Sequence, residues 1–205
     1  VDWPRWYEGY IPYKNVPLSV FLREKLRKGE VEYKIPLNYT VTYHDPCHNG
    51  RHLMHEIGKD CAFEASRECL ESIPGLKFKD MLRNRELQRC CGAGGGVKAG
   101  IPDLALDMAK ARVMDGEEVK ADVISSTCPF CRRNIMDGRN DAKSSIKVLD
   151  VVELMAASMG LDMTIPENPY TKYQEQDVLV CGPVECKIDT VERKAPGKDL
   201  VGEAH

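Results

Sequence analysis

The chain reads Ala121-Asp122-Val123-Ile124-Ser125-Ser126-Thr127-Cys128-Pro129-Phe130-Cys131 near its middle. The first six of these residues are typical of a short strand. Thr127 or Cys128 is suited to cap the helix that follows, which we expect to end near Gly138. A C-x-x-C pair, Cys128 and Cys131, therefore stands where a strand ends and a helix begins.

Other strands and helices alternate along the chain in the same way. We expect two further strands, at residues 39–43 and 146–149. We expect helices at residues 18–28, 52–73, 102–119 and 150–160, from their apolar spacing and from Gly and Pro at their ends. This alternation predicts an α/β fold with a small, largely parallel sheet and flanking helices. We divide the chain into an N-terminal arm with a short helix (1–35), a central domain (36–162) and an irregular C-terminal tail (163–205).

Three further thiols stand in turn-like contexts beside Gly or Pro. Cys47 follows the strand at 39–43, in Tyr43-His44-Asp45-Pro46-Cys47-His48, and two adjacent cysteines open the run Cys90-Cys91-Gly92-Ala93-Gly94-Gly95-Gly96. Together with the C-x-x-C pair they make five thiols. Tetrahedral zinc takes four ligands, so five thiols point to a cluster of several irons.

The adjacent pair, Cys90 and Cys91, favours metal binding over a disulfide. Neighbouring Cα atoms lie about 3.8 Å apart, which is below the usual spacing across a disulfide. We expect Gly92, Gly94 and Gly95 to let the backbone approach the cysteine sulfurs closely and to aim N–H groups at them.

The composition is that of an ordinary globular protein. The 205 residues are 42% hydrophobic and 30% charged, with a net charge of −3, and no basic run suggests a nucleic-acid partner. No apolar stretch has the length of a membrane span. Because the cysteines have metal-ligand spacings, we expect a reducing compartment and a cytoplasmic protein.

The three cysteine motifs, in this order, resemble the CCG (cysteine-rich) domain of the heterodisulfide reductase family over roughly residues 17–155. The chain resembles the C-terminal half of a heterodisulfide reductase D-type subunit or its sulfite-reduction-linked relatives. The resemblance implies that Cys47, Cys90, Cys91, Cys128 and Cys131 hold a [4Fe-4S] cluster of noncubane form.

By the same resemblance, the chain is expected to be an iron–sulfur oxidoreductase subunit that passes electrons to a disulfide or related sulfur substrate, or to a thiol carrier protein. Its partners would be other redox subunits, including a membrane-bound cytochrome-type subunit that could hold it at the membrane. Two alternatives stay open. One is an electron-relay subunit of a glycolate- or lactate-oxidase-like or quinone-linked system, and the other is a zinc-stabilised interaction module.

The remaining histidines and cysteines separate into two groups. His44 and His48 flank Cys47, and they are candidates for contacts to the ligating thiols or for catalytic proton donation. Cys61 and Cys69 lie on the buried stripe of the helix expected at 52–73 and are about 12 Å apart along it, so we expect core packing there. Cys181 and Cys186 have C-x4-C spacing, and we expect them to be unligated.

Overall fold

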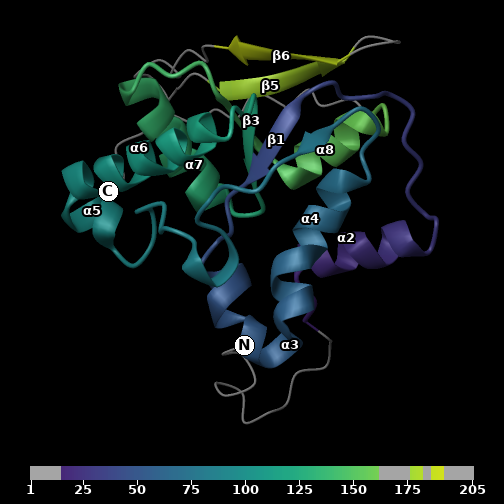
Figure 1. Ribbon diagram of the computed structural model, residues 1–205, viewed down its shortest axis with the longest axis horizontal. Helices are drawn as coiled ribbons and strands as arrows, with labels where there is room; N and C mark the ends of the chain where they lie inside the picture. The colour runs from purple at the N-terminus through teal and green to yellow at the C-terminus, as the bar shows by residue number, and fades with distance from the viewer. Residues whose placement is uncertain (1–14, 162–175, 182–185, 192–205) are drawn as a thin grey trace, which may run out of the picture.

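Four parallel strands form the centre of the molecule, in the order β2-β1-β3-β4 (Figure 1). The computed structural model describes residues 15–161, 176–181 and 186–191. The four strands are β1 (Thr40–Tyr43), β2 (Lys77–Phe78), β3 (Val123–Ser126) and β4 (Lys147–Asp150). The expected α/β fold is confirmed. The short edge strand β2 was not predicted, because two residues are too few for a periodic signal.

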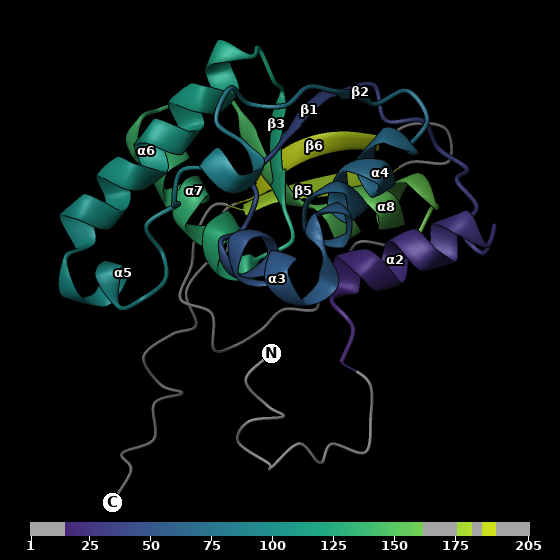
Figure 2. The same ribbon diagram turned by 60° about the horizontal axis from the view of Figure 1, so that its bottom comes forward.

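Helices cover both faces of this sheet. One layer contains α2 (Leu18–Arg27), α4 (Ala65–Glu71) and α8 (Val151–Ser158), and the other contains α5 (Val97–Gly100), α6 (Pro102–Glu118) and α7 (Pro129–Asp141). Figure 2 shows the two layers on opposite sides of β1 and β3. Side chains alternate between them, because Val123 of β3 packs with the first layer and its neighbour Ile124 packs with the second.

Local sequence explains where several helices begin. Pro102 occupies the first turn of α6, where its missing N–H is not needed. The expected capping box of α8 is present, with Val152 N donating to Asp150 Oδ1 (2.9 Å) and Asp150 N donating to Glu153 Oε2 (2.7 Å). Helix α7 continues beyond Gly138, to Asp141.

The prediction of a single helix at residues 52–73 was wrong. The chain instead forms π-helical turns η1 (His48–His52) and η2 (Asp60–Glu64), with the short helix α3 (Met54–Ile57) between them and α4 after η2. Gly58 separates α3 from η2 and has a φ of +80°, which an ordinary helical residue does not adopt. The break turns η2 back against α3 and against η1, which directly follows Cys47.

The structure also departs from the expected irregular tail. Strands β5 (Gln176–Cys181) and β6 (Cys186–Val191) pair in antiparallel fashion, and β5 lies beside β4 and α8. A 3-10 turn, η3 (Arg85–Leu87), lies between β2 and the double-cysteine loop. The expected arm up to residue 14 and the rest of the tail lie outside the described residues.

Candidate metal centre

The five cysteines of the three motifs line a single cavity of about 720 Å³. It opens at the carboxyl ends of β1 and β3, where open parallel sheets place their ligands. The other lining residues come from the segments that follow these strands and from the glycine run: Pro46, His48, Asn49, Ala93, Gly94, Gly95, Gly96, Lys98, Ala99, Thr127, Pro129 and Phe130. Segments far apart in sequence thus bring their thiols to one place.

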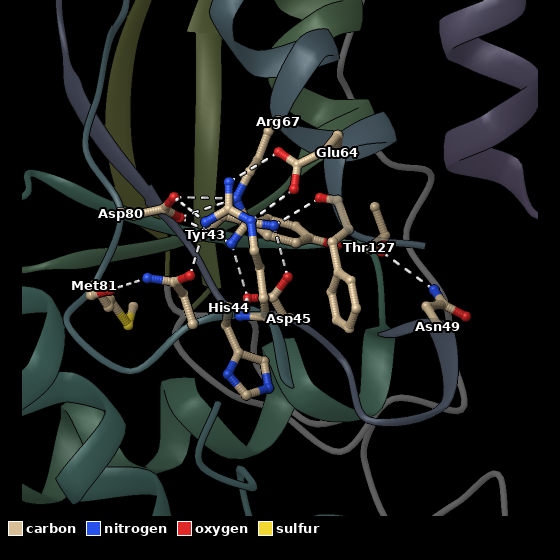
Figure 3. A network of polar contacts seen from close by, with 12 residues as sticks. Tyr43, His44, Asp45, Asn49, Glu64, Arg67, Asp80, Met81 and Thr127 are labelled. Atoms are coloured by element: carbon tan, nitrogen blue, oxygen red, sulfur yellow. Dashed lines mark hydrogen bonds and ion pairs between the residues drawn. The ribbon is translucent and has the colours of Figure 1, made fainter. Parts of the chain in front are cut away.

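Cys47 is positioned by the loop that leaves β1. It directly precedes η1, and its carbonyl accepts a hydrogen bond from His52 N at 3.1 Å. The loop is anchored by the nearby Asp45, whose buried carboxylate receives two bonds from Arg67. Figure 3 shows Asp45 and Arg67 lying beside the ring of Tyr43. Burial raises the pKa of the half-buried Cys47 thiol, and the nearby Cys90 and Cys91 thiols raise it further.

The C-x-x-C pair is positioned by the start of α7. Cys128 is the N-cap residue of this helix and Cys131 lies in its first turn, so their three-residue spacing places both thiols on the same side of the helix. The positive end of the helix dipole therefore faces the thiols. Cys128 is half-buried and Cys131 is buried.

The double-cysteine loop is held from two sides. Asn134 Nδ2, on α7, donates to the carbonyl of Cys91 at 2.6 Å and to the carbonyl of Ala105 at 2.9 Å. Gly92 N donates to Cys90 Sγ at 3.3 Å, which is the N–H to sulfur contact expected of the glycine run. Sequence spacing carried no signal for Asn134, because a polar residue inside a helix is usually on the surface.

Gly92 is required by packing, not by the cavity. Its φ is +83°, and a Cβ there would lie 2.7 Å from the carbonyl oxygen of Ala105. Gly94 and Gly95 do line the cavity, and a Cβ on either would meet open space. The glycines therefore have two tasks: Gly92 lets the loop press against α6, and the later ones keep one wall of the cavity bare.

The thiols are close enough to share protons. Cys91 Sγ and Cys131 Sγ are 3.2 Å apart and are not bonded as a disulfide. A hydrogen bond with Cys131 lowers the pKa of Cys91. A second hydrogen bond with Cys131 lowers the pKa of Cys128 to about 6. The pKa of Cys131 is raised, because its proton is shared with both neighbours. Thiolates held this close together favour a bound cation between them.

The two histidines beside Cys47 have different surroundings. His44 is only 1% exposed, and one of its ring nitrogens lies within 4.8 Å of the sulfurs of Cys91 and Cys131; burial lowers the pKa of His44. His48 is exposed at the rim of the cavity, where its Nδ1 lies 3.2 Å from Nδ1 of His52. Within the described residues, His44, Cys91 and Cys131 form the one cluster of side chains close enough to hold a metal ion as they stand.

Several residues that shape the site were not predicted. Arg112, fully buried on α6, donates to His44 Nδ1 at 3.1 Å. Phe130 is 70% exposed at the cavity mouth. Lys98 lines the cavity, and its ammonium group donates to Asn134 Oδ1 at 2.8 Å and pairs with Asp137. These contacts depend on which helices lie side by side, and sequence spacing does not reveal that.

Cys61 and Cys69 lie outside the cavity. Cys69 is fully buried in the core, as expected, and Cys61 is half-buried and accepts a hydrogen bond from Arg23 Nη2 at 3.0 Å. Neither is among the cavity-lining residues. Cys181 and Cys186 occupy opposite positions in the register of β5 and β6. That they are unligated stays a prediction.

The donor set fits an iron–sulfur cluster. Thiolates are the ligands that such clusters use, and five of them converge on a cavity with bare glycine walls. A single tetrahedral zinc ion would leave one thiol without a role. The residues present therefore suit a group larger than one ion.

Comparison with known proteins gives an independent view of this site. The sequence profile of the cysteine-rich domain (CCG) matches residues 41–136, which include all five cysteines. The chain is 51% identical over 163 residues to the D-type subunit of the dihydromethanophenazine:CoB–CoM heterodisulfide reductase of Methanosarcina acetivorans. The match covers 80% of this chain and 38% of that protein.

Two further relatives are more distant. The chain is 36% identical over 150 residues to a probable iron–sulfur-binding oxidoreductase of Bacillus subtilis, covering 72% of this chain and 20% of that protein. It is 34% identical over 155 residues to one subunit of the fumarate reductase (CoM/CoB) of Methanothermobacter marburgensis, covering 75% and 28%. The chain thus spans 38% of the length of the Methanosarcina proteins it matches.

These relatives and the converging thiols support an iron–sulfur cluster and an oxidoreductase role. None of the helices in the described part of the chain is long and apolar enough to cross a membrane. Residues 41–136 belong to the CCG cysteine-rich domain family, and the chain is a relative of the D-type subunits of heterodisulfide reductase.

Proposed function

We propose that this chain binds one [4Fe-4S] cluster of noncubane form and, as part of a redox complex, passes electrons to a disulfide or a related sulfur substrate. The ligands in this proposal are Cys47, Cys90, Cys91, Cys128 and Cys131. The observation that carries it is the convergence of five thiols from three loops on one open cavity. A noncubane arrangement is favoured because five ligands exceed the four that a cubane [4Fe-4S] cluster needs.

The cavity has features that suit a sulfur substrate beside the cluster. When bound, the cluster would supply single electrons to the sulfur–sulfur bond. Gly94 and Gly95 leave one wall without side chains, so a flexible thiol chain could approach closely. Phe130 offers an exposed apolar face at the mouth, which suits the hydrocarbon part of such a chain.

Disulfide cleavage also needs protons, and the two histidines would serve it differently. His48 is exposed at the rim of the cavity, so it can exchange protons with water and donate one to a departing thiolate. His44 is buried beneath Cys91 and does not line the cavity. We assign His44 a hydrogen bond to the ligating thiol and assign proton donation to His48.

Other redox subunits would complete the electron path. The relatives at about 50% identity are named as subunits of a heterodisulfide reductase that uses dihydromethanophenazine. We propose a similar setting for this chain, with a cytochrome-type subunit at the membrane as the electron donor.

A relay role is the second candidate. A relative named a probable membrane-anchored ferredoxin, from Chromohalobacter salexigens, is 28% identical over 178 residues, and the name of the Bacillus protein, a probable iron–sulfur-binding oxidoreductase, specifies no sulfur substrate. In that role the cavity would hold the cluster, and electrons would leave to another centre without a bound substrate.

Spectroscopy of the oxidised, cluster-loaded protein separates the two roles. On the disulfide proposal, adding a thiol gives a new paramagnetic signal that iron-57 enrichment broadens, because sulfur binds at the cluster. Simple alkyl thiols and sulfonated or phosphorylated thiols are the probes. If no probe changes the paramagnetic signal of the cluster while quinone-linked electron transfer proceeds, the result contradicts the disulfide proposal and supports the relay role.

A further inference from the structure

A chain of hydrogen bonds runs from α6 to the floor of the cavity. Arg112 has no exposed surface, and its Nε donates to His44 Nδ1 at 3.1 Å. The ring of His44 lies next to the thiol of Cys91. One ring nitrogen of His44 and the sulfurs of Cys91 and Cys131 lie within 4.8 Å of one another.

The direction of the first bond fixes the proton on His44. A guanidinium group has only donors, so Nδ1 of His44 must be the acceptor. An imidazolium ring has no acceptor, and a neutral ring has one nitrogen with a proton and one without. The bond to Arg112 therefore requires a neutral ring with its single proton on Nε2. That proton is the one ring N–H available to the sulfur of Cys91.

Arg112 is itself held in place by three other contacts. Its Nη1 donates to the carbonyl of Arg83 at 3.1 Å and to Asp115 Oδ2 at 2.8 Å, and its Nη2 donates to the sulfur of Met81. The carboxylate of Asp115 partly offsets the guanidinium charge, because it also pairs with Arg89 at 3.3 Å. Arg112 thus reaches His44 as a rigid donor.

We propose that Arg112 is a positioning residue: it locks His44 in the Nε2–H form, so that His44 donates a hydrogen bond to Cys91 and raises the reduction potential of the cluster bound there. This inference rests on the proposed function, because it needs Cys91 to be a cluster ligand. Hydrogen bonds to ligating sulfur withdraw electron density and favour the reduced cluster, and they are among the factors that set iron–sulfur potentials.

Potentials of four cluster-loaded proteins, measured anaerobically with detection by electron paramagnetic resonance, test the inference. They are the wild type, His44→Phe, Arg112→Leu and the double variant. At the wild-type midpoint potential, His44→Phe and Arg112→Leu should each lower the ratio of reduced to oxidised cluster about tenfold. For a one-electron couple, this corresponds to a midpoint potential that is lower by about 59 mV. The double variant should match His44→Phe alone, because Arg112 acts through the ring.

A matched control separates this role from general effects of removing a buried arginine. Arg23 is also buried, and its Nη2 donates to the sulfur of Cys61, outside the cavity. Arg23→Leu should leave the potential unchanged. Equal shifts in Arg23→Leu and Arg112→Leu, or a further shift when Arg112→Leu is added to His44→Phe, would mean that charge or folding is responsible and would overturn the inference.

A second measurement needs no arginine variant to fold. With ¹⁵N-labelled histidine, pulsed magnetic resonance of the reduced wild-type protein should detect one protonated histidine nitrogen coupled to the cluster, and His44→Phe should remove it. Absence of this coupling, with iron in place, overturns the inference alone. A wild-type protein that binds no iron overturns both the proposed function and this inference.

Discussion

Asp45 and Arg67 form a buried, bidentate ion pair, with Nη1 to Oδ1 at 2.7 Å and Nη2 to Oδ2 at 2.9 Å. Their side chains are 1% and 3% exposed, and Arg67 also bonds Asp80 and lies over the ring of Tyr43 (Figure 3). The pair joins the Cys47 loop to α4. The same carboxylate accepts a bond from Arg85 N at 2.8 Å, so one acidic side chain organises three segments behind the cavity.

Asp45→Asn should therefore be strongly destabilising. Leaving a buried charge without any partner costs about 3–5 kcal/mol; Arg67 keeps the partly exposed Asp80 as a second partner, so we expect a loss toward the lower end of this range. Urea unfolding of the cluster-loaded protein measures the change. Glu68→Gln is the matched control, because Glu68 accepts two bonds from Arg27 on the surface, where such pairs contribute little. Equal losses in the two variants would contradict the role given to Asp45.

The two tasks assigned to the glycines predict opposite results for neighbouring alanine substitutions. Gly92→Ala places a side chain at positive φ and against the Ala105 backbone, so we expect a stability loss of about 1–3 kcal/mol and poor iron retention. Gly94→Ala meets open space and should keep its iron. Thermal unfolding and iron content report both effects. A stable, iron-loaded Gly92→Ala protein would show that the loop does not need its close approach to α6.

Cys61 and Cys69 should be dispensable for the cluster. Cys61→Ala and Cys69→Ala remove thiols that do not line the cavity, so iron content should equal that of the wild type. Cys69→Ala should cost modest stability, because Cys69 is fully buried. Loss of iron from either folded variant would mean that the cluster extends beyond the five-cysteine cavity.

His48→Ala should slow disulfide reduction about 10²-fold if His48 is the proton donor, which is the low end of general acid catalysis. His55→Ala is the control, because His55 is also exposed but does not line the cavity. Turnover with a disulfide substrate, at equal iron content, measures the effect. Equal rates in His48→Ala and the wild type would remove His48 from the reaction and favour the relay.

Sequence spacing predicted the cysteine site better than it predicted the helical segments that follow Cys47. The strands that carry Cys47 and Cys128 were predicted because β-branched runs end directly at the cysteine motifs, and parallel strands bring such ends together. The break at Gly58 was missed, because the apolar residues recur every four positions on both sides of it. Periodicity reports which residues face the core, and it does not report whether the helix between them is continuous.

Contacts between distant segments account for the remaining omissions. Arg112 and Asn134 stand within helices, and a polar residue there is expected on the surface unless the neighbouring helix is known. The structure buries both against the cysteine loops. The paired strands β5 and β6 were missed because the prolines around them favoured an irregular segment.

Metal and sulfide analysis of protein purified without oxygen tests the central claim most directly. The account predicts a brown protein with about four irons per chain, matching acid-labile sulfide and no stoichiometric zinc. Cys90→Ser and Cys128→Ser should lose iron, because a hydroxyl is a poorer ligand than a thiolate. One zinc ion per chain with no iron, in a folded protein, would contradict the cluster and every redox role built on it.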